Sequence, residues 1–274
     1  MAKQKTYRMG EFSKRLGVSR DLIKHYEKQG ILTSRREKNN QYRYYYHAQY
    51  TSIPISRKLQ NVGYSLREIG HLLNDASLEE YTAENADRIA ALEREQLLRG
   101  MALENLRFVH TCQQEALEGK LLGRWELAER PELAFFPFSG TSEFLPLSPE
   151  ETDAVTDWAD AMPVVEYCGL LREETLIYGF SVRQERAELL ELPSPHVERV
   201  RPCRTFNTYL KIPRRPLERA VEKDLEDMQQ NLAPALSEVE RQGLTPTSPI
   251  LLRYLFEGPE DGKFCYYCQA SIPI

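Results

Sequence analysis

The sequence predicts three parts: a mainly α N-terminal winged helix-turn-helix, a long coiled-coil helix and an α+β C-terminal domain. Three observations predict them. Residues 1–74 show a basic pattern of short helices, residues 75–118 a proline-free helical pattern, and residues 119–274 strand-like runs rich in aromatic and β-branched residues. A length of 274 residues also suits two modest domains better than one. We take the three ranges as the expected domains.

Charge is divided unevenly along the chain. Residues 1–74 hold 15 Lys and Arg against 5 Asp and Glu, a net of +10, whereas residues 75–274 hold 21 against 36, a net of −15. Eight of the 15 tyrosines also lie in the basic part. Basic residues interleaved with tyrosines are typical of a nucleic-acid-binding surface, and a solvated basic face is the alternative.

Composition also limits where the protein works. No apolar run approaches the ~20 residues that a membrane-spanning helix needs. The first residues lack the apolar segment of a secretory signal, and five scattered cysteines argue against a disulfide framework. We therefore expect a cytoplasmic protein with no membrane partner.

A helix-turn-helix is predicted near the N-terminus. Met9, Phe12 and Leu16 form the apolar stripe of a first helix, Gly17 permits the tight turn, and Ser19 is a good N-cap for a second helix. That second helix turns Leu22, Ile23 and Tyr26 inward, and Arg20, Asp21, Lys24, His25 and Lys28 mostly outward. Outward cations on a helix that follows a glycine turn are how such a unit reads the major groove of DNA.

A β-hairpin wing is predicted next, over Arg35–Tyr46. Asn39 and Asn40 supply turn chemistry between two short extended pieces. Arginines and tyrosines at the wing would lie along the sugar-phosphate backbone and fix the register of the protein on DNA.

Two short helices and one long helix follow the wing. The first covers about residues 49–62, where Pro54 should kink or delay it, and Ser65 with Glu68 forms a capping box that starts the second. From residue 77 to 117 a 3-4 spacing indicates a long helix with a coiled-coil seam, made of Ile89, Leu92, Gln96, Arg99, Leu103, Leu106 and His110. Such a helix has too little to bury alone, so we expect a homodimer, with packing against the same chain as the alternative.

The remaining residues predict six strands and two helices. The helices cover residues 150–161 and a stretch after Pro216 marked by Leu217, Val221, Leu225, Met228 and Leu232, which continues past Pro234 towards Gly243. The strands cover residues 135–138, 164–171, 176–182, 204–210, 250–256 and 263–272.

Several motifs in order over residues 7–73 resemble those of MerR-family regulators. They are Tyr7-Arg8-Met9-Gly10-Glu11, Gly17-Val18-Ser19, Lys24-His25-Tyr26-Glu27, Tyr42-Arg43-Tyr44-Tyr45 and Gly63-Tyr64-Ser65-Leu66-Arg67-Glu68-Ile69. Residues 120–274 are similar, more weakly, to the GyrI-like effector-binding domain of the multidrug-sensing members. Lys24-His25 replaces the more usual Arg-Tyr, which affects the base preference.

The resemblance implies a homodimeric activator that binds double-stranded promoter DNA. It would distort an over-long promoter spacer so that RNA polymerase holoenzyme engages both promoter elements. The expected DNA-binding residues are Ser19, Arg20, Lys24, His25, Tyr26, Arg35, Arg36, Tyr42, Arg43, Tyr45 and Arg67.

The same resemblance suggests a ligand pocket in the C-terminal domain. Tyr167, Tyr178, Tyr209, Tyr254 and Tyr266 each fall on a different predicted strand, and four of them, all but Tyr254, match tyrosines that line the family's drug pocket. Leu252 stands where multidrug members keep a buried glutamate, and Glu166 and Glu257 are expected to be solvated. We therefore predict a lipophilic or aromatic small-molecule effector that stacks on flat aromatic walls.

Three other functions are alternatives. A thiol- or metal-responsive regulator would need converging cysteines, but Cys112 has no near partner, and Cys265 and Cys268 stand three apart on a strand, where side chains diverge. A small-molecule hydrolase would need a catalytic constellation that the sequence does not show. A passive architectural DNA binder is the third. We predict no catalytic residue, no metal ligand, no cofactor and no enzyme activity.

Overall fold

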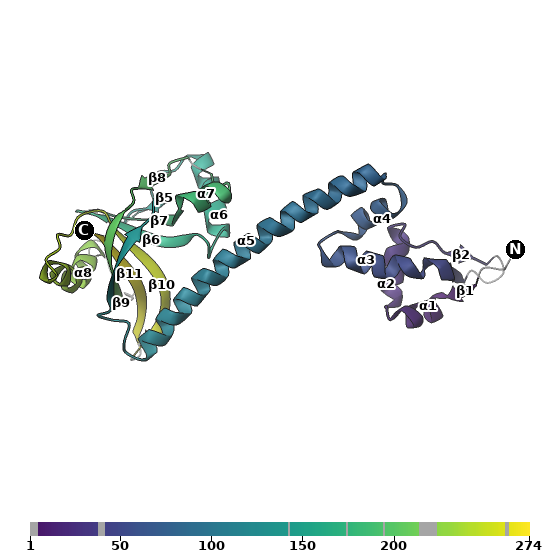
Figure 1. The fold of residues 1–274 in the computed structure, drawn as a ribbon, viewed down its shortest axis with the longest axis horizontal. Helices are drawn as coiled ribbons and strands as arrows, with labels where there is room; N and C mark the ends of the chain where they lie inside the picture. The colour runs from purple at the N-terminus through teal and green to yellow at the C-terminus, as the bar shows by residue number, and fades with distance from the viewer. Residues whose placement is uncertain are drawn as a thin grey trace. The chain divides into compact units, whose positions relative to one another are not determined.

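The structure is a computed structural model and describes residues 5–37, 42–141, 143–173, 175–193, 195–213, 224–260 and 263–274. The chain divides into two compact units, residues 1–97 and 98–274 (Figure 1). The helix α5 (Leu78–Leu117) contributes its first half to one unit and its second half to the other. The predicted turn residues Asn39 and Asn40 and the helix residues Leu217 and Val221 lie outside the described residues.

Short helices around a small sheet make up the N-terminal unit. The strands β1 (Thr6–Arg8), β3 (Arg43–Tyr46) and β2 (Arg35–Arg36) pair antiparallel in that order. The helical elements are α1 (Met9–Leu16), α2 (Arg20–Lys28), the 3₁₀ helix η1 (His47–Thr51), α3 (Ser52–Asn61) and α4 (Leu66–Asn74). One core joins them, and its largest fully buried side chains include Phe12, Tyr26 and Tyr45.

Local sequence explains where these helices begin and end. Gly17 has φ 63° at the end of α1, a left-handed conformation that favours glycine. Pro54 is the third residue of α3, where its missing N–H costs no helical hydrogen bond, and the preceding turn is 3₁₀. The predicted delay of this helix is therefore confirmed. Ser65 and Glu68 form the predicted capping box of α4.

The helix α5 confirms the predicted long helix. Ser77 and Glu80 exchange hydrogen bonds ahead of it, with Ser77 N–H donating to Glu80 Oε2 (2.7 Å) and Glu80 N–H to Ser77 Oγ (3.2 Å). Four apolar residues of the predicted seam are exposed: Ile89, Leu92, Leu103 and Leu106. The seam therefore has no cover within either unit of the single chain.

An eight-stranded antiparallel sheet dominates the C-terminal unit. Its order is β4-β9-β11-β10-β6-β7-β5-β8, and its six central strands divide into two halves with the same β-α-β-β sequence. One half contains β5 (Leu133–Ser139), α6 (Pro149–Asp160), β6 (Glu166–Arg172) and β7 (Thr175–Arg183). The other contains β9 (Cys203–Pro213), α8 (Asp224–Arg241), β10 (Ile250–Glu260) and β11 (Lys263–Pro273).

The sheet is covered on both faces. Trp158 of α6 packs on Phe136, and Leu232 of α8 packs with Leu252 on the same face of the sheet. The opposite face meets the second half of α5 through Cys112 and Tyr209. Figure 1 shows α8 and α5 on opposite sides of the sheet. The strands therefore separate an α6–α8 face from an α5 face.

All six predicted strands and both predicted helices of this unit are present in the described residues, with shifted ends. Three elements were not predicted: β4 (Trp125–Arg130), α7 (Gln184–Leu189) and β8 (Glu198–Val200). The two strands lie at the edges of the sheet. Within the described residues, no helix combines the length and apolar character needed to cross a membrane.

Candidate DNA-binding surface and ligand pocket

The helix α2 presents a row of polar side chains to solvent. Ser19 caps it, since its side chain accepts a hydrogen bond from Leu22 N–H at 3.1 Å. Arg20, Lys24 and His25 are exposed on the helix, as the sequence predicts. Lys24 donates to Asp21 at 2.9 Å, but both side chains are more than half exposed, so solvent screens the pair and leaves the ammonium accessible.

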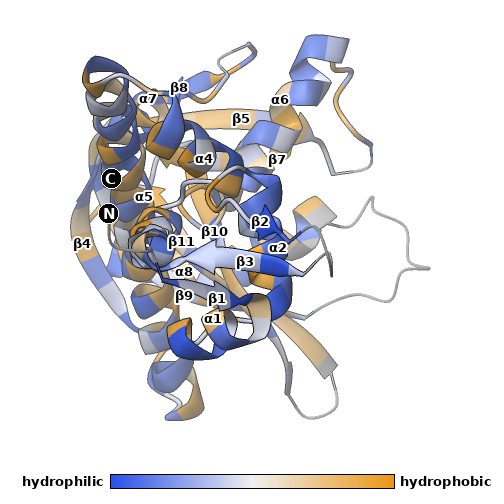
Figure 2. Cartoon of the chain, turned by 90° about the vertical axis from the view of Figure 1, so that its right-hand side faces the viewer, coloured by the Kyte–Doolittle hydropathy of each residue, from blue (hydrophilic) through white to orange (hydrophobic). Residues whose placement is uncertain are grey.

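The wing adds cations beside this helix. Arg35 and Arg36 are exposed on the short strand β2, which is strongly hydrophilic (Figure 2). Arg8 of β1 was not among the predicted residues, although it belongs to one of the quoted motifs. Its guanidinium lies 5.0 Å from the centre of the Tyr42 ring and donates to Tyr44 Oη at 3.2 Å. Arg8 and Arg36 border a groove of about 740 Å³, which is lined by Arg8, Met9, Gly10, Glu11, Arg20, Arg36, Tyr42 and Arg43.

Two predicted DNA-binding tyrosines are core residues instead. Tyr26 and Tyr45 are fully buried, so neither ring can reach DNA. Tyr26 Oη donates to Gln60 Oε1 at 3.1 Å, and burial raises the pKa of the Tyr45 phenol to about 12. The two motifs that contain these tyrosines identify the helix-turn-helix and the wing. Whether their tyrosines are buried depends on the tertiary core that α1, α3 and the wing complete.

Glu27 connects the wing to α2. Its Oε2 accepts from Tyr45 Oη at 3.3 Å and lies 3.4 Å from Arg43 Nε, while Oε1 accepts from Ser34 Oγ. The Arg43 side chain is therefore only one-third exposed, and it pairs with the Glu27 carboxylate. Glu27 positions the wing, a role that its place in the quoted Lys24–Glu27 motif could have suggested. Arg67, by contrast, is exposed in the first turn of α4.

Four of the five predicted ligand-binding tyrosines line one pocket on the α6–α8 face. The pocket holds about 460 Å³ and is bordered by Met162, Tyr167, Tyr178, Tyr254, Leu255, Phe256, Glu257 and Tyr266. The Tyr167 and Tyr254 rings lie 5.0 Å apart, and the Tyr254 and Tyr266 rings meet edge-on at 6.0 Å. Burial raises the pKa of the Tyr167 and Tyr254 phenols, so this wall is uncharged at neutral pH.

Comparison with known proteins assigns the N-terminal part. Residues 7–76 match the family model described as MerR HTH family regulatory protein. This part of the chain is a MerR-family helix-turn-helix. We call residues 7–76 the MerR head below. No curated protein matches the chain.

Solved structures that are similar to the chain include the following three. A structure described as the EcmrR–DNA complex in EcmrR-RPo has 17% identity and a TM-score of 0.39, and covers 97% of this chain and 98% of that one. A MerR-family transcriptional regulator from Bacillus cereus has 18% identity and a TM-score of 0.35, covering 40% and 84%. HiNmlR, a MerR-family regulator lacking the sensor domain and bound to promoter DNA, has 19% identity and a TM-score of 0.33, covering 42% and 94%.

Tyr209 and Leu252 do not line the aromatic pocket. Tyr209 pairs with Gln269 of β11 and faces α5, on the opposite side of the sheet from Tyr254. Leu252 is two residues from Tyr254 on the same face, but it is fully buried in the core beneath α8. The predicted set therefore mixes two faces, because a one-residue shift in register moves a side chain through the sheet.

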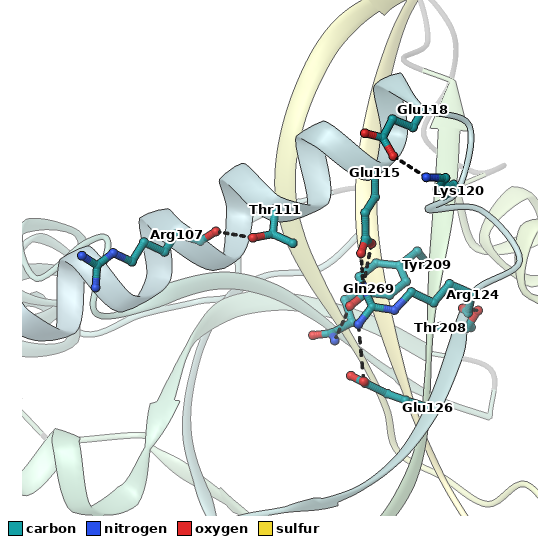
Figure 3. Close-up of polar contacts among 10 residues, drawn as sticks. All are labelled: Arg107, Thr111, Glu115, Glu118, Lys120, Arg124, Glu126, Thr208, Tyr209 and Gln269. Atoms are coloured by element: carbon teal, nitrogen blue, oxygen red, sulfur yellow. Dashed lines mark hydrogen bonds and ion pairs between the residues drawn. The ribbon is translucent and has the colours of Figure 1, made fainter.

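The last turns of α5 are fastened to the sheet by a polar clamp (Figure 3). Arg124 Nη1 donates to both carboxylate oxygens of Glu115 at 2.6 and 2.7 Å, and its Nη2 lies 3.5 Å from Glu126 Oε2. The guanidinium also lies 5.5 Å from the centre of the Tyr209 ring. Tyr209 therefore belongs to the junction between α5 and the sheet, and burial raises the pKa of its phenol to about 12.

A second junction lies nearly three turns earlier on α5, at Asn105 rather than Glu115. Asn105 donates to Glu166 Oε1 at 3.0 Å and accepts from Arg253 Nη2 at 3.0 Å, while Arg253 also pairs with Glu166. The Arg253 guanidinium lies 4.5 Å from the Phe108 ring centre. Glu166 is therefore not solvated as the sequence suggested. Burial raises its pKa, although Arg253 favours the charged form. Glu257, also expected to be solvated, is exposed at the rim of the aromatic pocket.

The five cysteines are free thiols, and four of them are buried. Cys112, Cys168, Cys265 and Cys268 are buried free thiols, and Cys168 lies 2.9 Å from Ser181 Oγ. Burial raises the pKa of Cys168 to about 12, so its thiol stays protonated. Among the described residues, no group of three or more His, Cys, Asp or Glu side chains is arranged to hold a metal ion.

Proposed function

We propose that the chain is a ligand-responsive, DNA-binding transcriptional regulator that senses a lipophilic or aromatic small molecule. The observation that carries the proposal is the combination, in one chain, of a MerR head and a separate unit with a tyrosine-lined pocket. The protein would act as an activator on a promoter with an over-long spacer, with RNA polymerase holoenzyme as its partner.

The exposed cations of the MerR head are the proposed DNA contacts. Arg20, Lys24 and His25 would approach base edges from α2, while Arg8, Arg35, Arg36, Tyr42 and Arg43 would hold phosphates from the wing. Arg67 would contact the backbone from α4. A groove that Arg8, Arg20, Arg36 and Arg43 line, with Glu11 as its one acidic residue, favours a polyanion.

The proposal includes a homodimer through α5. Residues 103, 106 and 110 lie roughly 160° around the helix from Asn105, Phe108 and Cys112, at about 100° per residue. The latter three pack on the sheet, whereas Leu103 is 46% exposed and Leu106 63% exposed. An apolar seam turned away from its own sheet suits a second copy of the helix.

The aromatic pocket is the proposed effector site. Tyr167, Tyr178, Tyr254 and Tyr266 offer ring faces and edges within 5.0 to 6.3 Å of one another, a wall on which a flat ligand can stack. Because Tyr254 and Arg253 are neighbours on β10, a ligand that moves this strand would also move the Arg253–Asn105 contact to α5. We propose this strand as the connection between pocket and helix.

Binding experiments on the full chain test both activities. DNA selected from a random pool should yield a pseudo-palindromic operator, and Arg43→Ala should weaken binding to every sequence, while Lys24→Ala and His25→Ala should also change base preference. Arg241→Ala, an exposed arginine on α8, is the matched control and should bind as wild type.

The pocket is tested with a neutral aromatic dye, N-phenyl-1-naphthylamine, whose fluorescence rises in apolar surroundings. Tyr254→Ala and Tyr266→Ala should weaken dye binding and leave operator binding intact, whereas Tyr50→Ala, at a 47% exposed tyrosine of the other unit, should change neither. Equal dye binding by the wild type and the three variants would show that the dye does not bind in the aromatic pocket.

A further inference from the structure

A cluster of arginines lines a second pocket of the C-terminal unit, separate from the aromatic pocket. The pocket holds about 380 Å³ and lies where the ends of β4, β6, β8 and β11 meet the start of β9 and the segment before β10. Its lining residues are Arg130, Arg172, Arg199, Val200, Arg201, Cys203, Thr247, Ser248, Pro249 and Pro273. Four of these ten residues are arginines and none is acidic. We propose that this pocket binds a compact tetrahedral oxyanion such as a phosphate group.

Arg130 is the buried centre of the cluster. It is 8% exposed, and its Nε and Nη1 groups are buried with no hydrogen-bond partner among the residues that the structure describes. Nη2 donates to the Arg201 carbonyl oxygen at a long 3.5 Å, beside Cys203. A buried guanidinium without an acidic partner is costly, because desolvation disfavours its charge, and the same burial lowers the pKa of Arg130.

The surrounding cations increase the cost of charging Arg130. Arg199 and Arg201 are exposed at its rim, and Arg172 pairs with Glu198, whose carboxylate is not among the lining groups. Like charges held together disfavour one another. A bound anion would replace this repulsion by attraction, chiefly to the Arg130, Arg199 and Arg201 guanidinium groups, because Arg172 is shared with Glu198.

The donors also fit the chemistry of an oxyanion. Guanidinium groups offer paired N–H donors in a planar fork that matches phosphate oxygens. Ser248 adds a hydroxyl to the lining, and Thr247 Oγ1 donates to the Pro273 carbonyl at 3.3 Å, which holds this segment against the end of β11. The volume is at the lower end of the roughly 300–1,000 Å³ of small-molecule sites, enough for a phosphate with a small organic substituent.

Calorimetric titration of the full chain with inorganic phosphate, at constant ionic strength set by chloride, tests the proposal. Saturable binding is expected for the wild type. Arg199→Ala with Arg201→Ala should weaken binding by at least about tenfold, because each lost charge-assisted hydrogen bond is worth that much. Both side chains are exposed, so this double variant should fold. Arg241→Ala, whose side chain pairs with Glu238 outside the pocket, should bind phosphate as wild type.

Arg130 is tested by a pair of variants. Arg130→Met should abolish phosphate binding, while Arg130→Lys, which keeps the charge, should retain part of it. A thermal melt of each variant separates loss of binding from loss of folding, and the Arg199/Arg201 double variant decides the matter if both Arg130 variants unfold.

Further titrations define the ligand class. Tighter binding of glycerol 3-phosphate than of inorganic phosphate would identify a phosphorylated small molecule, and the reverse order would identify the free ion; both support the proposal. Phosphate binding unchanged in the Arg199/Arg201 variant, no saturable binding to wild type, or equal binding of succinate would overturn it. No DNA or aromatic compound is present, so this result is independent of the regulator function.

Discussion

Replacing Glu27 should loosen the wing of the MerR head without disturbing its fold. In Glu27→Ala the fully buried Tyr45 hydroxyl loses its acceptor, and Arg43 and Ser34 lose theirs. An unsatisfied buried hydroxyl costs about 1–3 kcal/mol, whereas the one-third-exposed Arg43 can be rehydrated and adds about 0–1 kcal/mol. We expect local destabilisation of roughly 2–3 kcal/mol in Glu27→Ala and about 1 kcal/mol in Glu27→Gln, which keeps an acceptor.

Hydrogen exchange followed by mass spectrometry on the full chain measures this local opening directly. Peptides that cover α2 and β3 should exchange faster in Glu27→Ala, and Tyr45→Phe should reproduce only a small part of the change, because it removes the hydroxyl and leaves the carboxylate its other partners. Operator affinity should fall with unchanged base preference, since the wing is proposed to contact phosphates and not base edges. Unchanged exchange in Glu27→Ala, or equal effects of Glu27→Ala and Glu27→Gln, would refute the reasoning.

Four other predictions follow from the structure. Asp at both Leu103 and Leu106 should give monomers with operator binding lost, whereas a wild-type monomer by light scattering would contradict the dimer. Arg8→Ala should weaken operator binding across all sequences and reduce its salt dependence, as a titration in potassium chloride would show. Tyr209→Ala should leave N-phenyl-1-naphthylamine affinity intact but increase hydrogen exchange in the last turns of α5. Loss of dye binding in this variant would show that Tyr209 does line the ligand pocket. Hydrogen bonds from Ser65 lower the pKa of Glu68. The stability that this cap gives α4 should therefore be present at neutral pH and be lost as the pH falls through that lowered pKa. Hydrogen exchange in α4 should rise with acid in the wild type, and Glu68→Gln should lack this acid-dependent change.

The head was largely predictable because its signals are local. A glycine at φ 63°, a serine cap and the Ser65–Glu68 capping box each act over three or four residues, so their effect is visible in the sequence. Which aromatic side chains are buried was not predictable in the same way. Tyr45 is enclosed and Tyr42 is 55% exposed although they are three residues apart, because only Tyr45 faces Phe12 and the core.

Strand register limited the prediction of the ligand pocket. Tyr209 lies between Thr208 and Leu210, and nothing in that local pattern tells which of the alternating positions faces α8. An irregularity between Tyr254 and Phe256 further shifts the pairing of β10 with β11, so strict alternation fails within the pocket itself. The edge strand β4 is short, and its Trp125 and Leu127 are exposed whereas Arg130 is buried, so its apolar residues do not mark a buried face.

Ion pairs and hydrogen bonds between residues far apart in the chain could not be predicted from the sequence. Arg253 and Asn105 are 148 positions apart and meet only when α5 packs on the sheet, and Glu166 becomes partly buried by the same contact. Residues that connect α5 to the sheet therefore had no local pattern to identify them, although they are the proposed route from pocket to helix.

Transcription in vitro tests the central claim most directly. The template carries the selected operator within a lengthened promoter spacer, and the effector is the tightest binder from a thermal-shift screen of lipophilic aromatic compounds. We predict that the compound changes transcript yield with wild-type protein and not with Tyr254→Ala, at equal operator occupancy. Transcript yield that is the same with and without bound compound in the wild type would contradict the account.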